Sequence, residues 1–190
     1  MPKRIPNLQE TIVATAARLF SQFGYDAVDM KQVAAEAGTS VGNLYNYFSS
    51  KPALFLAIIH RWRNELLEAC KEILSQDLPR REKISTVLHR LYEDVAAWHG
   101  LWKEFLGGRE ERHHMMEAKA KNAGSHPFGL GPEEDALLRD FEKILTGNPE
   151  PVAPFRWSYL VITATLQLAG RYPQAREENW KFLETLVDKL

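Results

Sequence analysis

Residues 29–48 read DMKQVAAEAGTSVGNLYNYF, and this stretch decides the fold because it predicts two short helices joined by a tight turn. Asp29 is placed to cap the first helix, and Gln32 follows at the spacing that lets a side chain return a hydrogen bond to the cap. Gly38 supplies a left-handed residue just past the first helix, and Ser40 can cap the second. Helices separated by so short a turn cross steeply, which predicts a helix-turn-helix.

The second of these helices has two faces with different properties. At 100° per residue, Val41, Leu44 and Phe48 fall on one apolar side. The opposite side is small or carries amides, so a backbone can approach a base edge there and amides can hydrogen-bond to it. The residues of this second face are Gly42, Asn43 and Asn46.

Tyr45 and Tyr47 flank that polar face, and their hydroxyls suit phosphate oxygens at the border of a groove. An ordinary surface helix of a bundle is the alternative, but exposed tyrosines beside a glycine and two asparagines favour DNA. Lys51 opens the next helix, where a lysine can clamp a phosphate. The expected DNA-contacting residues are Thr39, Ser40, Val41, Gly42, Asn43, Tyr45, Asn46, Tyr47 and Lys51.

These residues carry a family resemblance. The run from Thr11 to Lys51 resembles the DNA-binding domain of TetR-type bacterial regulators. TIVATAARLFSQFGYDAV is similar to the family's first helix, which ends in F-x-x-x-G-Y/F, here Phe20, Gly24 and Tyr25. VAAEAGTSVGNLYNYFSSK is similar to the signature I-A-x-x-A-G-V-S-x-G-x-L-Y-x-Y-F-x-x-K. The resemblance implies a DNA-binding regulator that dimerises through its two terminal helices, is released by a small ligand, and uses Lys51 on the DNA backbone.

The chain departs from the family pattern at three positions, which lie in the second helix of the helix-turn-helix and in the turn before it. Thr39 replaces a common valine, Val41 stands where a lysine, arginine or proline is frequent, and Asn43 stands where threonine is frequent. These changes leave the fold alone and bear on which operator sequence is read.

Composition and charge fit a soluble globular protein with a polyanionic partner. Hydrophobic residues make up 45% of the chain and charged residues 26%. Residues 1–63 contain seven Lys or Arg and four Asp or Glu, a net charge of +3, whereas the remainder carries −4. A basic amino-terminal part is what a DNA partner requires. Lys3 and Arg4 fit either a DNA-contacting arm or a frayed terminus.

The pattern along the chain predicts an all-α protein. A three-helix DNA-binding domain with the helix-turn-helix, residues 1–50, is followed by a helical ligand-binding and dimerisation domain, residues 51–190. The expected helices span residues 8–23, 29–37, 40–48, 51–76, about 80–106, 132–146, 154–170 and 173–190. In the first of them Ile12, Ala16, Leu19, Phe20 and Phe23 share one face, which we expect to close the three-helix core.

The two terminal helices follow one another so closely that they must form an antiparallel hairpin. The first is apolar on nearly every side, so one face packs inward and another needs a partner. A second copy of the chain is the simplest partner, which predicts a homodimer through these helices.

A second-domain cavity for a flat or apolar small molecule is suggested by a supply of aromatic and related side chains. The candidate pocket residues are Trp98, His99, Trp102, Phe105, Phe128, Trp157 and Tyr159. Core packing explains most of them equally well, and both roles stay open.

We expect no metal site, no cofactor and no enzymatic activity. His113 and His114 are adjacent, whereas metal ligands on a helix sit three or four residues apart. No phosphate loop or nucleophile motif occurs in its structural context. The single Cys70 excludes an internal disulfide framework and is expected to be a packed thiol. No apolar run approaches the roughly 18 to 20 residues that span a bilayer, so we expect no membrane partner and a cytoplasmic protein.

The sequence therefore predicts a dimeric transcriptional regulator, a repressor released from a palindromic double-stranded DNA operator by a small hydrophobic or aromatic ligand. The alternative is a DNA-binding adaptor or DNA-organising protein whose carboxy-terminal domain binds a protein partner instead of a ligand.

Overall fold

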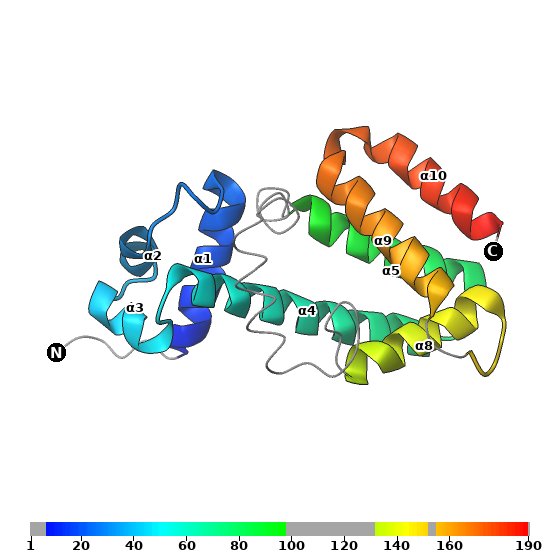
Figure 1. Cartoon of the computed structure of the whole chain (residues 1–190), viewed down its shortest axis with the longest axis horizontal. Helices are drawn as coiled ribbons and strands as arrows, with labels where there is room; N and C mark the ends of the chain where they lie inside the picture. The colour runs from blue at the N-terminus through cyan, green and yellow to red at the C-terminus, as the bar shows by residue number, and fades with distance from the viewer. Residues whose placement is uncertain (1–6, 98–131, 152–154, 190) are drawn as a thin grey trace. The chain divides into compact units, whose positions relative to one another are not determined.

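The computed structural model describes residues 7–97, 132–151 and 155–189, and every regular element in these ranges is helical (Figure 1). The predicted all-α class is confirmed. The elements are α1 (Leu8–Phe23), α2 (Met30–Glu36), α3 (Val41–Tyr47), α4 (Lys51–Ser75), α5 (Arg80–Ala97), α8 (Pro132–Thr146), α9 (Arg156–Arg171), the 3₁₀ turn η1 (Pro173–Ala175) and α10 (Arg176–Asp188).

The chain forms two compact units, Met1–Asn64 and Glu65–Leu190, and the division falls within α4. The sequence places the boundary earlier, between residues 50 and 51, at the start of that helix. The assignment of a DNA-binding role to one part and a ligand-binding role to the other stays a prediction.

The first unit is a cluster of α1, α2, α3 and the first half of α4 around one apolar core. Ile12, Phe20, Val33 and Leu44 are each fully buried, as the pattern of the three short helices predicts. The remaining buried side chains of the unit are Val13, Ala16, Leu19, Tyr25, Val28, Met30, Ala34, Ala37, Phe48, Leu54, Phe55 and Ile58.

The expectation that Phe23 joins this core is wrong, because its side chain is 52% exposed. The helix ends directly after it, and Gly24 adopts φ 86°, which turns the chain back. Tyr25 then fills the place against the core and meets Phe20 edge to face, with ring centroids 5.3 Å apart. The residue after the turn therefore takes the position that the helical pattern gives to Phe23.

The second unit has its own core, to which the end of α4 and helices α5, α8, α9 and α10 contribute. Cys70 lies in it, and burial raises the pKa of this thiol to about 11, with Arg90 opposing and Asp94 reinforcing the shift. The buried side of α5 consists of Ile84, Val87, Leu88, Leu91, Tyr92 and Val95. The core cluster consists of Cys70, Ile84, Val87, Leu88, Phe141, Leu145, Val161 and Val187.

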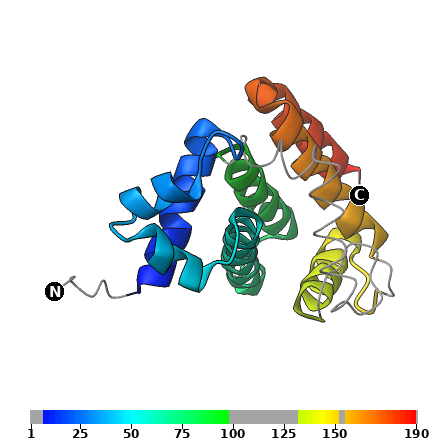
Figure 2. The same ribbon diagram turned by 60° about the vertical axis from the view of Figure 1, so that its left-hand side comes forward.

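The predicted terminal hairpin is confirmed, since α9 and α10 lie side by side in both views (Figures 1 and 2). The helix bounds differ slightly from those expected, because η1 separates the two helices and contains Pro173 at its first position. None of the described helices combines the length and apolar character needed to cross a membrane.

Helix ends in the second unit are capped by side chains from other helices. Phe155, which precedes α9, offers no capping side chain. Instead, the buried carboxylate of Glu142 on α8 accepts hydrogen bonds from the backbone N–H groups of Trp157 (3.3 Å) and Ser158 (2.6 Å). At the carboxy-terminal end of α8, close to Glu142, the Arg80 guanidinium donates to the backbone oxygens of residues 144 and 145. Each helix terminus thus depends on a neighbouring helix.

A buried amide ties α10 to α9 and α5. The Nδ2 of Asn179 lies 2.8 Å from the Tyr172 backbone oxygen and 3.0 Å from the Tyr92 hydroxyl. Two ion pairs at the surface join α5 to α10 as well. They are Arg81–Asp188 at 2.8 Å and Arg176–Glu93 at 2.6 Å.

Candidate nucleic-acid interface

The two helices of the predicted helix-turn-helix start with the caps that the sequence predicts. Asp29 Oδ1 accepts a hydrogen bond from the Gln32 N–H at 2.7 Å, and Ser40 Oγ accepts one from the Asn43 N–H at 3.1 Å. Gly38 has φ 68°, so the left-handed turn residue is confirmed. These local contacts fix where α3 begins and which residues face outward.

Helix α3 buries one side and exposes the other, as predicted. Leu44 is fully buried and anchors the helix to the core. Tyr45 and Tyr47 are 48% and 45% exposed, an unusual share for large aromatic side chains in a compact unit. Gly42 and Asn46 are also exposed, while Thr39, Val41 and Asn43 are half-buried and Ser40 is exposed. The exposed side of α3 therefore offers amides, hydroxyls and open backbone.

Gly42 is not required by the packing of the chain itself. A Cβ added to this residue would meet no atom within 4 Å, and its backbone is in the ordinary helical region. Glycine inside a helix costs roughly 1 kcal/mol relative to alanine, so the fold alone would favour alanine here. The missing side chain leaves the backbone of α3 open to close approach by another molecule.

Asn43 is held by a neighbour within the interface. Its Nδ2 donates to the Thr39 Oγ1 at 2.9 Å, a contact between residues four positions apart. The amide is thereby restricted to one orientation at the start of α3. Both residues are among those expected to contact DNA, but the hydrogen bond between them was not expected, although a spacing of four residues is the signal that could have revealed it.

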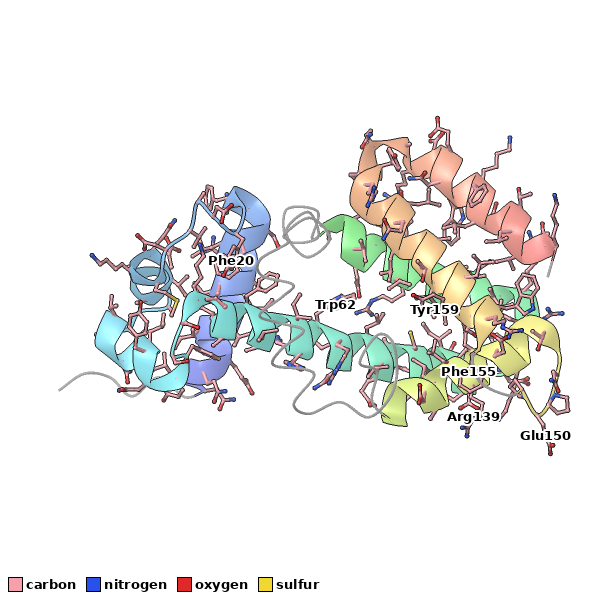
Figure 3. The ribbon with its side chains drawn as sticks, in the orientation of Figure 1. Phe20, Trp62, Arg139, Glu150, Phe155 and Tyr159 are labelled. Atoms are coloured by element: carbon pink, nitrogen blue, oxygen red, sulfur yellow. The ribbon has the colours of Figure 1, made fainter. Side chains whose placement is uncertain are left out.

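Lys51, the first residue of α4, places its ammonium over aromatic rings. Its Nζ lies 4.2 Å from the centroid of the Tyr25 ring and 5.9 Å from that of Phe20, which is labelled in Figure 3. Ser50 caps the same helix by accepting a hydrogen bond from the Ala53 N–H at 3.2 Å. The sequence does not reveal Tyr25 as a partner of Lys51, because no helical spacing links the two residues.

Residues of the candidate ligand pocket are only partly within the described chain. Trp157 lies in the first turn of α9 with 44% of its surface exposed, and Tyr159 is half-buried on the same helix (Figure 3). The pocket stays a prediction. The other candidates, Trp98, His99, Trp102, Phe105 and Phe128, lie outside the described residues, as do Lys3, Arg4 and the pair at 113 and 114. Among the described residues, no group of three or more His, Cys, Asp or Glu could hold a metal ion.

Comparisons with known proteins match both the segment that contains the helix-turn-helix and the fold. The model of the bacterial regulatory proteins of the tetR family matches residues 12–58. An uncharacterised HTH-type transcriptional regulator of Mycobacterium tuberculosis is 26% identical over 168 residues, which cover 85% of this chain and 76% of that protein.

Two solved structures share the fold over nearly the whole chain. A TetR-family transcriptional regulator from Mesorhizobium loti has a TM-score of 0.71 at 15% identity, covering 98% of this chain and 96% of that one. FadR from Bacillus subtilis, solved in complex with stearoyl-CoA, has a TM-score of 0.64 at 15% identity, with coverage of 95% and 96%. The helix-turn-helix and the matched family model show that residues 12–58 form a DNA-binding domain of the tetR family of bacterial regulatory proteins, and the chain as a whole has the fold of TetR-family transcriptional regulators.

Proposed function

We propose that the chain acts as a homodimer that reads a palindromic operator with α3 and represses transcription until a small apolar or aromatic ligand releases it. The match of residues 12–58 to a family of transcriptional regulators agrees with the prediction that the chain is not an enzyme. The further parts of the proposal rest on separate features of the molecule.

The open backbone at Gly42 carries the DNA-reading part of the proposal. The fold gains nothing from a glycine at this position, while a base edge or phosphate gains room to approach. Exposed Tyr45, Asn46 and Tyr47 on the same short helix supply the polar groups that hydrogen-bond to a duplex.

The decisive experiment measures stability and DNA binding in the same variant. An operator is first selected with the full chain from a library of random double-stranded DNA. Gly42→Ala should raise the free energy of unfolding by about 0.5 to 1 kcal/mol and at the same time weaken operator binding. A variant that is more stable than the wild type but binds the operator less tightly cannot owe its weaker binding to misfolding. Operator affinity equal to or above that of the wild type would overturn the role given to α3.

Two further variants separate base reading from phosphate contact. Asn43→Ala should relax preference at one operator position, at a cost of about 1 to 3 kcal/mol for the preferred base. Lys51→Ala should weaken binding to all DNA sequences alike. It should also lower the salt slope, which is the slope of log affinity against log salt concentration, by about one. Thr39→Val removes the hydroxyl that holds Asn43 and keeps the side-chain shape, so it should resemble Asn43→Ala in a weaker form. Equal losses on operator and random DNA for both residues would refute this division.

Exposed apolar side chains on the terminal hairpin support the homodimer. Trp157 and Leu160 on α9 are 44% and 47% exposed, and Phe182 on α10 is 55% exposed. With Ala164, the two α9 residues recur at spacings of three and four, so they share one face of the helix. Leu160→Glu should give monomers in sedimentation and a large loss of operator affinity, since half-sites are read in pairs. Thr86→Glu, which adds the same charge to the exposed side of α5, is the matched control.

An acyl thioester is the first ligand class to test, because FadR of Bacillus subtilis, which shares this fold, was solved with stearoyl-CoA. Thermal unfolding should be followed with acyl-CoA of increasing chain length and with free CoA as the control. A ligand that releases the operator must itself bind more weakly when the operator is present, by the same factor, typically about 5- to 150-fold. No stabilisation by acyl-CoA or by flat aromatic compounds would favour the adaptor function instead.

A further inference from the structure

We propose that Tyr25 is a positioning residue for DNA binding: its ring holds the Lys51 ammonium in place for a backbone phosphate. The inference rests on the proposed function and assigns a task to a side chain that belongs to the core. It starts from three aromatic rings and one lysine, all within the first compact unit.

The Tyr25 ring is a rigid platform. Its side chain is only 6% exposed. It meets the rings of Phe20 and Phe55 edge to face, with centroid distances of 5.3 Å and 5.1 Å and interplanar angles of 65° and 68°. Such contacts on two sides fix the plane of the ring, because edge-to-face pairs have a preferred geometry. A group bound to this face is therefore fixed with respect to the core.

The Lys51 ammonium is bound to that face. Its Nζ lies 4.2 Å from the Tyr25 centroid and 5.9 Å from the Phe20 centroid, both inside the roughly 6 Å range of a cation–π contact. The lysine is the first residue of α4, where the positive end of the helix dipole disfavours a cation. The negative ring faces offset that disadvantage and keep the charge at the helix start.

Holding the ammonium in advance reduces what DNA binding costs. A lysine free in solution samples many rotamers, and ordering one such side chain at an interface costs affinity. Lys51 is separated from the exposed Tyr47 only by the connection that ends in the cap Ser50. Its charge is thereby fixed next to the helix that reads the bases. Removing the ring should keep the charge but lose this ordering, so that DNA binds roughly 2- to 10-fold more weakly.

The positioning itself is testable without DNA. A proton above an aromatic face resonates upfield, so the side-chain ε-protons of Lys51 should be shifted upfield in the NMR spectrum of the full chain. Tyr25→Phe keeps the ring and should keep the shift, whereas Tyr25→Leu should abolish it. Unshifted ε-protons in the wild type would overturn the proposal even if no Tyr25 variant folds.

The consequence for DNA is tested with a duplex of random sequence, because a phosphate contact is independent of sequence. Tyr25→Leu should weaken binding by roughly 2- to 10-fold with an unchanged salt slope, and Tyr25→Phe should bind like the wild type. Lys51→Ala should weaken binding and also lower the slope by about one. In the Lys51→Ala background, Tyr25→Leu should have no further effect.

The outcomes separate this inference from the proposed function. Equal weakening by Tyr25→Leu in both backgrounds would mean that the ring only supports the fold, which overturns the inference alone. Tighter binding by Tyr25→Leu would mean that the ring competes with phosphate, which also overturns it. A different outcome is that Lys51→Ala binds DNA like the wild type, while the Lys51 ε-protons of the unmutated chain are shifted upfield. That result would remove the DNA role of Lys51 from the proposed function, and with it the task given to Tyr25.

Discussion

The two compact units secure their helix ends in different ways. In the first unit each cap is local: Asp29, Ser40 and Ser50 each accept a hydrogen bond from the N–H three residues later. In the second unit, Glu142 of α8 caps α9, and Arg80 at the start of α5 caps the end of α8. Local caps let each short helix define its own start. Caps supplied by another helix, here Glu142 and Arg80, are called borrowed caps. They make the ends of several helices depend on one another.

This difference has an energetic consequence. A lost local cap costs one hydrogen bond at an exposed helix end, where water can replace it. Loss of the Glu142 cap leaves the buried N–H of Ser158 unpaired and loosens a contact between helices at the same time. Single substitutions should therefore have larger and more widespread effects in the second unit than in the first.

The largest effect is expected at Glu142. Glu142→Ala removes the carboxylate that accepts from Trp157 and Ser158, so the free energy of unfolding should fall by about 3 kcal/mol. Urea denaturation measures the change. Glu150→Ala, at an exposed position labelled in Figure 3, is the matched control and should stay within about 0.5 kcal/mol. Similar small values for both residues would break the comparison between the units.

The sole cysteine reports where the Glu142 variant opens. Burial raises the pKa of Cys70 from 9.0 to about 11, which lowers its thiolate fraction near neutral pH about 100-fold. Alkylation of the native chain at pH 8 should therefore be slow and depend on opening of the second core. Glu142→Ala should accelerate this labelling, whereas loss of a cap in the first unit should not.

A smaller effect is expected at Asn179. Asn179→Leu keeps the approximate volume but removes the donors to the Tyr172 backbone oxygen and the Tyr92 hydroxyl, at a cost of about 2 kcal/mol. Tyr92→Phe leaves the Asn179 contact with Tyr172 intact and should cost about 1 kcal/mol. Chemical denaturation of both single variants and the double variant gives their coupling. Additive losses would show that the three groups are not one network.

A local cap should matter less. Asp29→Ala removes the side chain that caps α2 and should cost about 1 kcal/mol, visible as faster hydrogen exchange of α2 amides. Asp26→Ala, at an exposed position that begins no helix, is the control for loss of one carboxylate. Faster exchange in the second unit as well would show that the cap is not local in its effect.

The smallest effect is expected for the surface ion pair of the first unit. Arg18 and Glu36 join α1 and α2 at 2.7 Å, but their side chains are 54% and 50% exposed. Arg18→Gln should change stability by less than about 0.5 kcal/mol, and salt should reduce the difference further. Thermal unfolding at low and high salt measures it. A loss above that of Asp29→Ala would reverse the expected order within this unit.

The same contrast explains what the sequence could and could not predict. Asp29, Gly38, Ser40 and the buried Leu44 follow from spacings within a few residues, and the structure has each as expected. The caps of the second unit span 15 or more residues in sequence, so no local pattern reveals them. Their detection requires knowledge of which helices are neighbours.

The candidate interface shows the same limit on a smaller scale. Helical periodicity separates the exposed side of α3 from its buried side, because both follow from 100° per residue. It cannot place Tyr25 under Lys51, since the turn at Gly24 interrupts the helix and brings the next residue back to the core. The misassignment of Phe23 has the same physical cause.

The borrowed caps also impose an order on assembly during synthesis. Glu142 precedes the amides that it caps, and Arg80 precedes the carbonyls that it caps, so each cap is already in the nascent chain when its helix end emerges. Asp188 on α10 instead follows its partner Arg81. At about 5 to 20 residues per second, the ribosome needs roughly 2 to 9 s to synthesise the chain from Leu145, near the end of α8, to Asp188. Nascent chains stalled before α10 should therefore already protect the start of α9 from hydrogen exchange. Until α10 emerges, the apolar side of α9 that it covers is exposed to chaperones and to other nascent chains.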